Sequence, residues 1–389
     1  MKNPAKLRFD LNGKFKIMVV GDIHEKYRID EKSEDFLRLI NRALDELQPD
    51  LAILMGDIVS NGAYDSQGNR YDLTVEELRV PIFRVVEPFK KRNVPLALVF
   101  GNHDGESESG LAKEVILSLF QEYDNFLVES TPGITGVGNM NLPILSSNTD
   151  DYAYNLWLFD SGNREEGSRS YAYLQDDQIR WYEETAQNLK EKNGGAPLPA
   201  LVFQHIPVME EYELLKTSSP LNPSAVQGHG IFSDNWYVLD KSKATGHMGE
   251  GPCTPDHNSG QFESWKKQGD VLAAFFGHDH MNDFCGSVDG IMLCQSKCSG
   301  FHIYGDGLRQ GVRMIVLDED NPADIQTRMH RYREYFGTKC NSIKGYMLIN
   351  DRAHGVIENT LKYVGPVVGL AALGYLGYKI SKKKKNKQK

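Results

Sequence analysis

Five short polar clusters, each placed directly after an apolar run, contain the residues of this chain that are best suited to chemistry. They are Gly21-Asp22-Ile23-His24, Gly56-Asp57, Gly101-Asn102-His103-Asp104, Gln204-His205 and Gly277-His278-Asp279-His280. Carboxylate and amide oxygens together with imidazole nitrogens form the mixed ligand set that divalent transition metals accept. The clusters therefore predict a metal site built from distant parts of the chain.

The apolar runs before these clusters predict the strands that position them. The runs are Phe15–Val20, Leu51–Met55, Pro95–Phe100, Pro199–Phe203 and Val271–Phe276. Short apolar runs of this kind are typical of strands buried on both faces. Helical spacing near 33–47, 74–92 and 112–123 alternates with the first three runs, and this order favours a mostly parallel α/β sheet. Ligands that follow parallel strands converge on one edge of the sheet.

Further elements are expected in the second half of the chain. The patterns predict a strand pair at 134–148 and 152–160, a helix at 176–191, and strands at 286–295 and 311–318. The charged segment Asp324–Arg333 favours a helix. Residues 218–260 are dense in Ser, Pro, Gly and Asn, and a long loop inside a compact domain is usually functional. We therefore expect a wall or lid over the site there.

The spacing of the ligands favours two ions rather than one. The candidate metal ligands are Asp22, His24, Asp57, Asn102, His205, His278 and His280. Asp22 and His24 are separated by one residue, which lets both face one ion in a turn. Asp57 is the natural bridge, because a carboxylate gives one oxygen to each of two cations. Two cations can hold an anionic phosphate ester, neutralise developing charge and acidify a bound water.

Two further residues of the third cluster are expected to assist catalysis. His103 follows a ligand directly, and it can donate a hydrogen bond to a phosphoryl oxygen or a proton to the leaving group. Asp104 and Asp279 are expected to orient ligand histidines through hydrogen bonds. Weaker candidates for contact with the substrate are His229, His247, His257, His302, Asn258, Tyr304, Arg164 and Arg169.

The order Asp-x-His, Gly-Asp, Gly-Asn-His-Asp, His and Gly-His-x-His resembles the calcineurin-like metallophosphoesterase superfamily over about residues 14–318. This resemblance implies a four-layer α/β/β/α sandwich with a dinuclear centre. It gives the first metal Asp22, His24, Asp57 and His280. It gives the second metal Asp57, Asn102, His205 and His278. It gives His103 the role of the catalytic histidine.

The flanks of the last cluster are similar to the purple-acid-phosphatase-like branch with an Asp-x-His first motif. One position departs from true purple acid phosphatases. They carry a tyrosine three residues after the second-motif aspartate, whereas Ser60 follows Asp57 at that distance here. A purple Fe(III) centre is therefore not expected. The two ions can be divalent or trivalent, and the N/O ligands admit Mn, Fe, Zn, Co or Ni.

Composition favours one catalytic domain with a C-terminal appendage. The chain has 389 residues, 40% of them hydrophobic, and a net charge of −9, which argues against general nucleic-acid binding. We expect a catalytic domain at 1–320, an extension at 321–362 and an apolar, Lys-rich tail at 363–389. The five cysteines, which lack paired C-x-x-C spacing, are expected to be free thiols in a reducing compartment.

The composition of the tail indicates contact with a membrane. Residues 364–380 are apolar and contain several glycines, and six lysines follow in 381–389. The N-terminus lacks a secretory signal pattern. We therefore expect a cytoplasmic catalytic domain with membrane contact through the C-terminal segment. A spanning helix, an interfacial anchor bound to anionic lipid and a soluble tail all stay open at this point.

The leading hypothesis is a hydrolase that cleaves phosphate monoesters. A phosphodiesterase of nucleotide or nuclease type would use the same metals, and a membrane-associated metal-binding scaffold would keep the site without turnover. Neither the physiological substrate nor the oligomeric state follows from the sequence.

Overall fold

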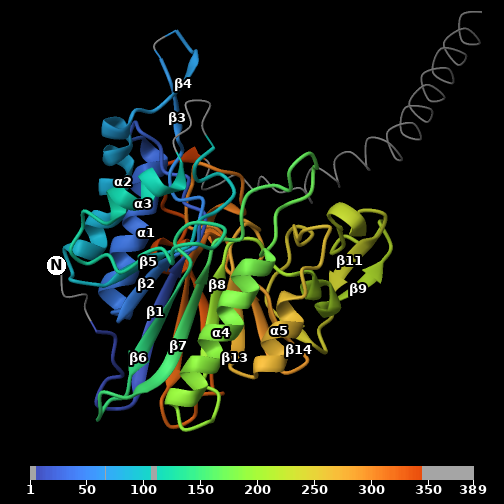
Figure 1. Ribbon diagram of the computed structural model, residues 1–389. Helices are drawn as coiled ribbons and strands as arrows, with labels where there is room; N and C mark the ends of the chain where they lie inside the picture. Colours follow the sequence, from blue (N-terminus) through green and yellow to red (C-terminus); the bar gives the residue numbers. More distant parts are fainter. Residues whose placement is uncertain (1–5, 66, 107–111, 344–389) are drawn as a thin grey trace, which may run out of the picture.

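The computed structural model describes residues 6–65, 67–106 and 112–343, and two β-sheets facing each other form its centre (Figure 1). The first sheet has the strand order β17-β16-β1-β2-β5. Its strands are β1 (Lys14–Val20), β2 (Leu51–Leu54), β5 (Leu96–Leu98), β16 (Gly311–Asp318) and β17 (Gln326–Arg331). Strands β1, β2 and β5 are parallel, whereas β16 and β17 run antiparallel to their neighbours.

The second sheet has the order β12-β14-β15-β13-β8-β7-β6. Its strands are β6 (Met140–Leu145), β7 (Tyr152–Phe159), β8 (Ala200–Gln204), β12 (Ala244–Thr245), β13 (Val271–Phe276), β14 (Cys285–Val288) and β15 (Ile291–Gln295). The inner strands β7, β8, β13 and β15 are parallel. The ligand-bearing strands of both sheets thus carry the parallel pairing that the sequence predicts.

Helices cover the outer face of each sheet. They are α1 (Glu31–Leu47), α2 (Val75–Lys90), α3 (Lys113–Phe120), α4 (Asp176–Lys192), α5 (Gln261–Gln268) and the short α6 (Tyr332–Phe336). Helices α1, α2 and α3 lie beside the first sheet, and α4 and α5 lie beside the second (Figure 1). The expected four-layer α/β/β/α sandwich is confirmed.

The buried strands explain why this arrangement is stable. Along β8, Leu201 and Phe203 belong to the core between the sheets, while Ala200 and Val202 belong to the core beneath α4 and α5. Because successive side chains of a strand point to opposite faces, a continuous apolar run is what a strand covered on both sides requires.

The remaining elements decorate the sandwich. They are the hairpin β3 (Gly62–Tyr64) and β4 (Arg70–Asp72), the small sheet of β9 (Leu215–Ser218), β10 (Val226–Gln227) and β11 (Trp236–Leu239), and the 3₁₀ turns η1 (Met209–Leu214), η2 (Gly230–Phe232) and η3 (Gly307–Arg309). Short strands and a 3₁₀ turn thus occur within 218–260, but most of this range consists of turns and irregular segments, as its composition indicates.

Three local predictions are wrong. Residues 286–295 form most of the β14–β15 hairpin, with a turn at Asp289-Gly290, rather than one strand. Residues 326–331 form the edge strand β17 rather than part of a helix. Thr327 bonds the Met314 carbonyl and Met329 is buried, so alternate side chains face inward with the period of a strand. Cys285 and Cys294 form a disulfide between β14 and β15 rather than free thiols. These cysteines are direct cross-strand neighbours, a pairing that the nine-residue separation alone does not reveal.

The predicted membrane segment at 363–389 lies outside the described residues. Within the described ranges, no helix combines the length and the apolar character needed to cross a membrane.

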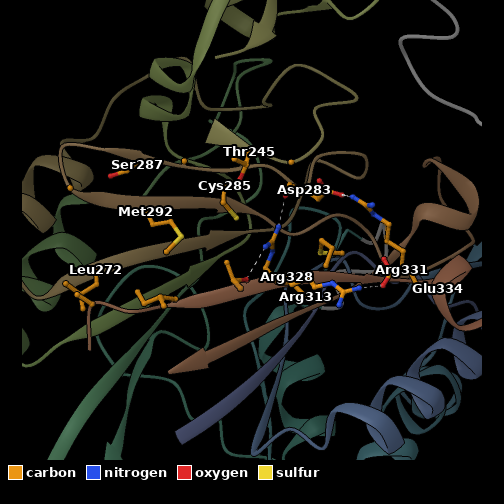
Figure 2. A pocket seen from close by; sticks show the side chains of 17 residues that line it. Thr245, Leu272, Asp283, Cys285, Ser287, Met292, Arg313, Arg328, Arg331 and Glu334 are labelled. Atoms are coloured by element: carbon orange, nitrogen blue, oxygen red, sulfur yellow. Dashed lines mark hydrogen bonds and ion pairs between the residues drawn. The ribbon is translucent and has the colours of Figure 1, made fainter. Parts of the chain in front are cut away.

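A groove of about 800 Å³ opens where the two sheets separate, between the β14–β15 hairpin and the β16–β17 edge (Figure 2). Its charged side chains are engaged with one another or with the backbone. Arg331 pairs with Asp283 at 2.8 Å, and Arg328 pairs with Glu334. Arg313 bonds two backbone carbonyls, at 2.7 and 2.8 Å, and so ties the two sheets together.

Candidate metal centre

The five polar clusters meet at the carboxyl ends of β1, β2, β5, β8 and β13. At this rim several candidate ligands adopt left-handed backbone conformations, with φ of 34° at Asp22, 48° at His24, 49° at Asp57 and 70° at His278. Asp and His tolerate this region better than most residues. Backbone strain of this kind concentrates at functional sites, where the surrounding fold has to impose it.

One group of four residues is arranged to hold a first ion. Asp22, His24, Asp57 and His280 are all buried, and their possible ligand atoms lie within 4.8 Å of one another. His24 Nε2 is 3.5 Å from Asp57 Oδ2, and His280 Nε2 is 3.5 Å from Asp22 Oδ1. These four are the residues that the family resemblance assigns to the first metal.

A second group shares Asp57 with the first. It contains Asp57, His205 and His278, again with their possible ligand atoms within 4.8 Å. His205 Nε2 lies 3.4 Å from Asp57 Oδ2 and 3.1 Å from Asn102 Oδ1, so the amide oxygen belongs to this side of the cup. All seven predicted ligands are therefore brought together, with Asp57 between the two groups.

Several atoms of this cup, which is formed by the seven candidate ligands, lack a hydrogen-bond partner. His24 Nε2, Asp57 Oδ2 and His278 Nε2 are buried and form no hydrogen bond. Buried polar atoms are normally satisfied, and each exception calls for an explanation such as an ion. Imidazole nitrogens and a carboxylate oxygen converging in this way suit transition-metal ions, so the residues present fit a metal pair.

Backbone carbonyls orient two of the ligand histidines. His205 Nδ1 lies 2.6 Å from the Met55 carbonyl oxygen, and His280 Nδ1 lies 3.1 Å from the Tyr304 carbonyl oxygen. Each contact leaves Nε2 facing the cup. This is the role that the sequence analysis gave to Asp104 and Asp279, and that expectation is wrong for both carboxylates.

Asp104 instead fastens the loops that carry other ligands. It is fully buried and accepts hydrogen bonds from the backbone N–H groups of Asp57, Ile58 and Gly101, at 2.8 to 3.0 Å. It is thus a positioning residue for Asp57. Asp279 likewise accepts from the Cys253 backbone and the Asn282 side chain. A turn of three successive polar residues gives no sequence signal for which of them faces inward.

Close packing of the loops depends on Gly101. A methyl group at this position would overlap Asp57 Oδ1 and the Asp57 backbone nitrogen. Glycine is therefore required there because the Asp57 loop approaches the backbone directly.

The electrostatics of the cup favour the metal-binding form of His24 and Asp57 but the protonated form of His205. Burial lowers the pKa of His24 to about 4, so its ring is neutral near pH 7. Burial opposes ionisation of Asp57, but His205 and His24 hold the pKa of this carboxyl well below its usual value. Burial also opposes protonation of His205, yet Asp57 and Asp22 raise its pKa to about 9. Metal binding would have to displace that proton.

His103 stands apart from the seven ligands. Its side chain is 48% exposed, whereas the ligand side chains are buried. Its backbone N–H donates to Asp57 Oδ1 at 2.8 Å, and its ring lies 5.5 Å from that of His24. Nδ1 lies 2.6 Å from Glu106 Oε2, and this contact raises the pKa of His103. Glu106 was missed by the sequence analysis, although its position three residues after His103 was a usable signal.

An aromatic residue that the sequence analysis also missed flanks the second group. The ring of Tyr171 meets that of His278 edge-on at 4.3 Å, and the Arg164 guanidinium lies 4.5 Å from the Tyr171 ring centre. The ring of His229 also lies near Tyr171, with ring centres 5.3 Å apart. Arg164 and His229 were predicted as weaker candidates for contact with the substrate. The structure places both beside Tyr171, which in turn contacts the candidate ligand His278.

The other weaker candidates are spread more widely. Tyr304 lies against His280, with ring centres 4.2 Å apart. His302 contacts Ser33 and Asp30 at the start of α1, and His257 lies beside Tyr173. Tyr304 is therefore the one of these three that touches a candidate ligand.

The comparisons with known proteins agree with this geometry. The family model for calcineurin-like phosphoesterases matches residues 15–282. The chain belongs to this family. Its members depend on two metal ions, in line with the two ligand groups that share Asp57.

Curated relatives extend the match. The chain is 28% identical to "Probable inactive purple acid phosphatase 28" of Arabidopsis thaliana, over 77% of this chain and 74% of that protein. It is 26% identical to "Probable inactive purple acid phosphatase 14" of the same plant, over 92% and 86%. It is also 26% identical to "Phosphatase DCR2" of Saccharomyces cerevisiae, over 72% of this chain and 47% of that protein.

Proposed function

We propose that this protein is a dinuclear metal-dependent phosphatase that hydrolyses phosphate monoesters. The observation that carries the proposal is the shared carboxylate of Asp57, which lies between two groups of buried ligands with unpartnered atoms. Family membership supports phosphoester hydrolysis, and the preference for monoesters follows the phosphatase names of the relatives.

We assign metal binding to the buried side chains of the site and substrate contact to the half-exposed His103. The buried side chains Asp22, His24, Asp57 and His280 would hold one ion, and Asn102, His205 and His278 would complete the second site with Asp57. When bound, the cations would neutralise charge on the phosphoryl group and would lower the pKa of a water so that a hydroxide nucleophile is available near neutral pH.

His103 is proposed as the group that meets the substrate directly. It is half exposed at the rim, and Glu106 holds Nδ1 so that Nε2 is left for the substrate. A protonated imidazole there can donate to a phosphoryl oxygen or to the departing oxygen. Glu106 acts through His103 and is a positioning residue.

The word "inactive" in the names of two relatives makes the decisive test one of turnover. The full-length protein is loaded in turn with Mn, Fe, Zn, Co and Ni, and hydrolysis of p-nitrophenyl phosphate is compared with that of bis-p-nitrophenyl phosphate. We expect metal-dependent turnover with the monoester as the better substrate. A better diester reverses the proposed preference. Stoichiometric metal without turnover of either ester would leave a metal-binding scaffold.

The role of His103 is tested by leaving-group dependence. His103→Ala is expected to lower kcat by about 10²–10⁴-fold, and by more for phenyl phosphate than for p-nitrophenyl phosphate, because the poorer leaving group needs the proton more. The matched control is Asp234→Asn, because Asp234 is exposed and lies just before β11 in the small sheet. This variant should leave both rates unchanged. Equal losses for the two esters would argue against proton donation by His103.

A further inference from the structure

A pocket of about 490 Å³ adjoins the metal centre at His24 and His103. Its lining includes the segment Lys26–Asp30, which follows the first ligand cluster, and residues of the β3–β4 hairpin. The hairpin stands out from the top of the sandwich in Figure 1. Because His103 lies between the cup and this pocket, a substrate with its phosphoryl group in the cup would extend its leaving group here.

The carboxylates of the pocket already have partners. Asp30 caps α1 by accepting from the N–H groups of Lys32 and Ser33. Asp65 closes the hairpin turn by accepting from the backbone N–H groups of residues 67 and 69. Glu106 holds His103. These anions are therefore committed to the structure of the pocket walls.

The cationic side chains of the same pocket are not paired. Lys26, Arg28 and Arg70 line it, and none of the three forms an ion pair or a side-chain hydrogen bond within the described residues. Arg70 lies against the backbone of β3, since a methyl group on Gly62 would come 2.9 Å from Arg70 Nε. The hairpin thus contributes a guanidinium group to the same pocket that Lys26 and Arg28 line.

Apolar groups lie between these charges. Ile29 and Tyr64 line the pocket and are 58% and 61% exposed, and Tyr27 and Ile303 line it as well. Exposed large apolar side chains that gather in one concavity, together with a few polar groups, are typical of ligand sites.

We infer that this pocket selects monoesters whose leaving group combines a flat apolar portion with a second anionic group. The inference rests on the proposed phosphatase function and deepens it. Arg28 and Arg70 would bind the second anion, which can be a carboxylate or a phosphate, because guanidinium recognises both through paired N–H groups. Tyr64 and Ile29 would contact the flat portion.

Two matched pairs of substrates test the inference. The first compares 4-(carboxymethyl)phenyl phosphate with 4-methylphenyl phosphate, which share a phenolic leaving group and differ in a carboxylate. The second compares adenosine 3′,5′-bisphosphate with adenosine 5′-monophosphate, which differ in a phosphate. p-Nitrophenyl phosphate gives the baseline turnover, so that failure of the phosphatase proposal is seen separately.

In at least one pair, we expect kcat/KM to be about three- to tenfold higher for the substrate with the additional carboxylate or phosphate, as exposed ion pairs allow. The preferred pair identifies the second anion. The Arg28→Gln/Arg70→Gln double variant should lose this preference and keep its turnover of p-nitrophenyl phosphate. High salt should weaken the preference in the wild type.

The matched control is Arg180→Gln, at an exposed position on α4 beside the second sheet, and it should keep the preference. Thermal melting of both variants confirms folding. Turnover of p-nitrophenyl phosphate without a preference in either pair, or a preference that survives in the double variant, overturns the inference.

Discussion

The metal centre with its adjoining pocket and the groove between the sheets differ in how far their polar side chains are paired with hydrogen-bond or ion-pair partners. The groove is larger, at about 800 Å³ against 490 Å³, yet Asp283 holds both Arg331 and the buried Lys297. Arg313 Nε and Arg331 Nε also lack hydrogen bonds in the groove, but both guanidinium groups bond through their other nitrogens. At the metal centre, by contrast, buried ligand atoms without partners converge on one another. The comparison teaches that convergence of unsatisfied groups indicates chemistry better than the size of a cavity.

The largest expected effect comes from removing the shared ligand. Asp57→Asn keeps the shape of the side chain but removes the charge that both ligand groups use. We expect a loss of about 10³-fold or more in kcat, together with reduced metal content measured by elemental analysis. A variant that kept two ions and full turnover would contradict the bridging position of Asp57.

A smaller effect is expected from crowding the cup without touching a ligand atom. Gly101→Ala would push Asp57 aside, and misplacement by about 1 Å can cost about 10²-fold in rate. Steady-state kinetics measures the loss, and thermal melting separates it from unfolding. Normal kcat in a folded variant would show that the Asp57 loop can relax.

Glu211 tests whether a lone unsatisfied group is enough to indicate a site. Its Oε1 is buried without a partner, but Glu211 belongs to neither ligand group. Burial raises its pKa from 4.5 to about 8. The folded state therefore keeps a proton that the unfolded state has lost, and stability falls as pH rises from 4.5 through about 8.

Glu211→Gln should remove this pH-dependent cost. We expect the variant to be more stable than the wild type above pH 8, by on the order of a few kcal/mol, with the difference shrinking towards pH 5. Denaturant unfolding across this range measures the difference, and turnover near pH 7 should change little. A difference that does not grow with pH would refute the assignment of the raised pKa.

The smallest effect is expected in the groove. Arg328 is 66% exposed and pairs with Glu334. Arg328→Gln should change the free energy of unfolding by less than about 1 kcal/mol and leave kcat/KM unchanged. A large loss of turnover would show that the groove takes part in the reaction and would reverse the comparison between the two regions.

The sequence was sufficient to predict that the candidate ligands gather, because each follows an apolar run typical of a buried strand. Their division into two groups followed from the family resemblance. Val20, Met55 and Phe276 end apolar runs, and the polar clusters after them are expected to meet at the edge where parallel strands end. The four-layer sandwich followed from the family resemblance in the same motifs.

Contacts between side chains and backbone could not be predicted in this way. The orientation of His205 by the Met55 carbonyl depends on loop conformations that no residue type specifies. Tyr171 reaches His278 from more than a hundred residues away in the chain. The edge strand β17 was misread because its charged residues face solvent and conceal the alternation of Thr327 and Met329.

The position of β1 has a consequence for how the molecule is made. This strand lies between β2 and β16, and Lys14 pairs with Asp318. During synthesis its β16-facing edge stays uncovered until roughly three hundred further residues have left the ribosome. Open strand edges recruit other chains. Nascent chains stalled before residue 311 should therefore depend on chaperones, and truncation at that point should yield insoluble protein.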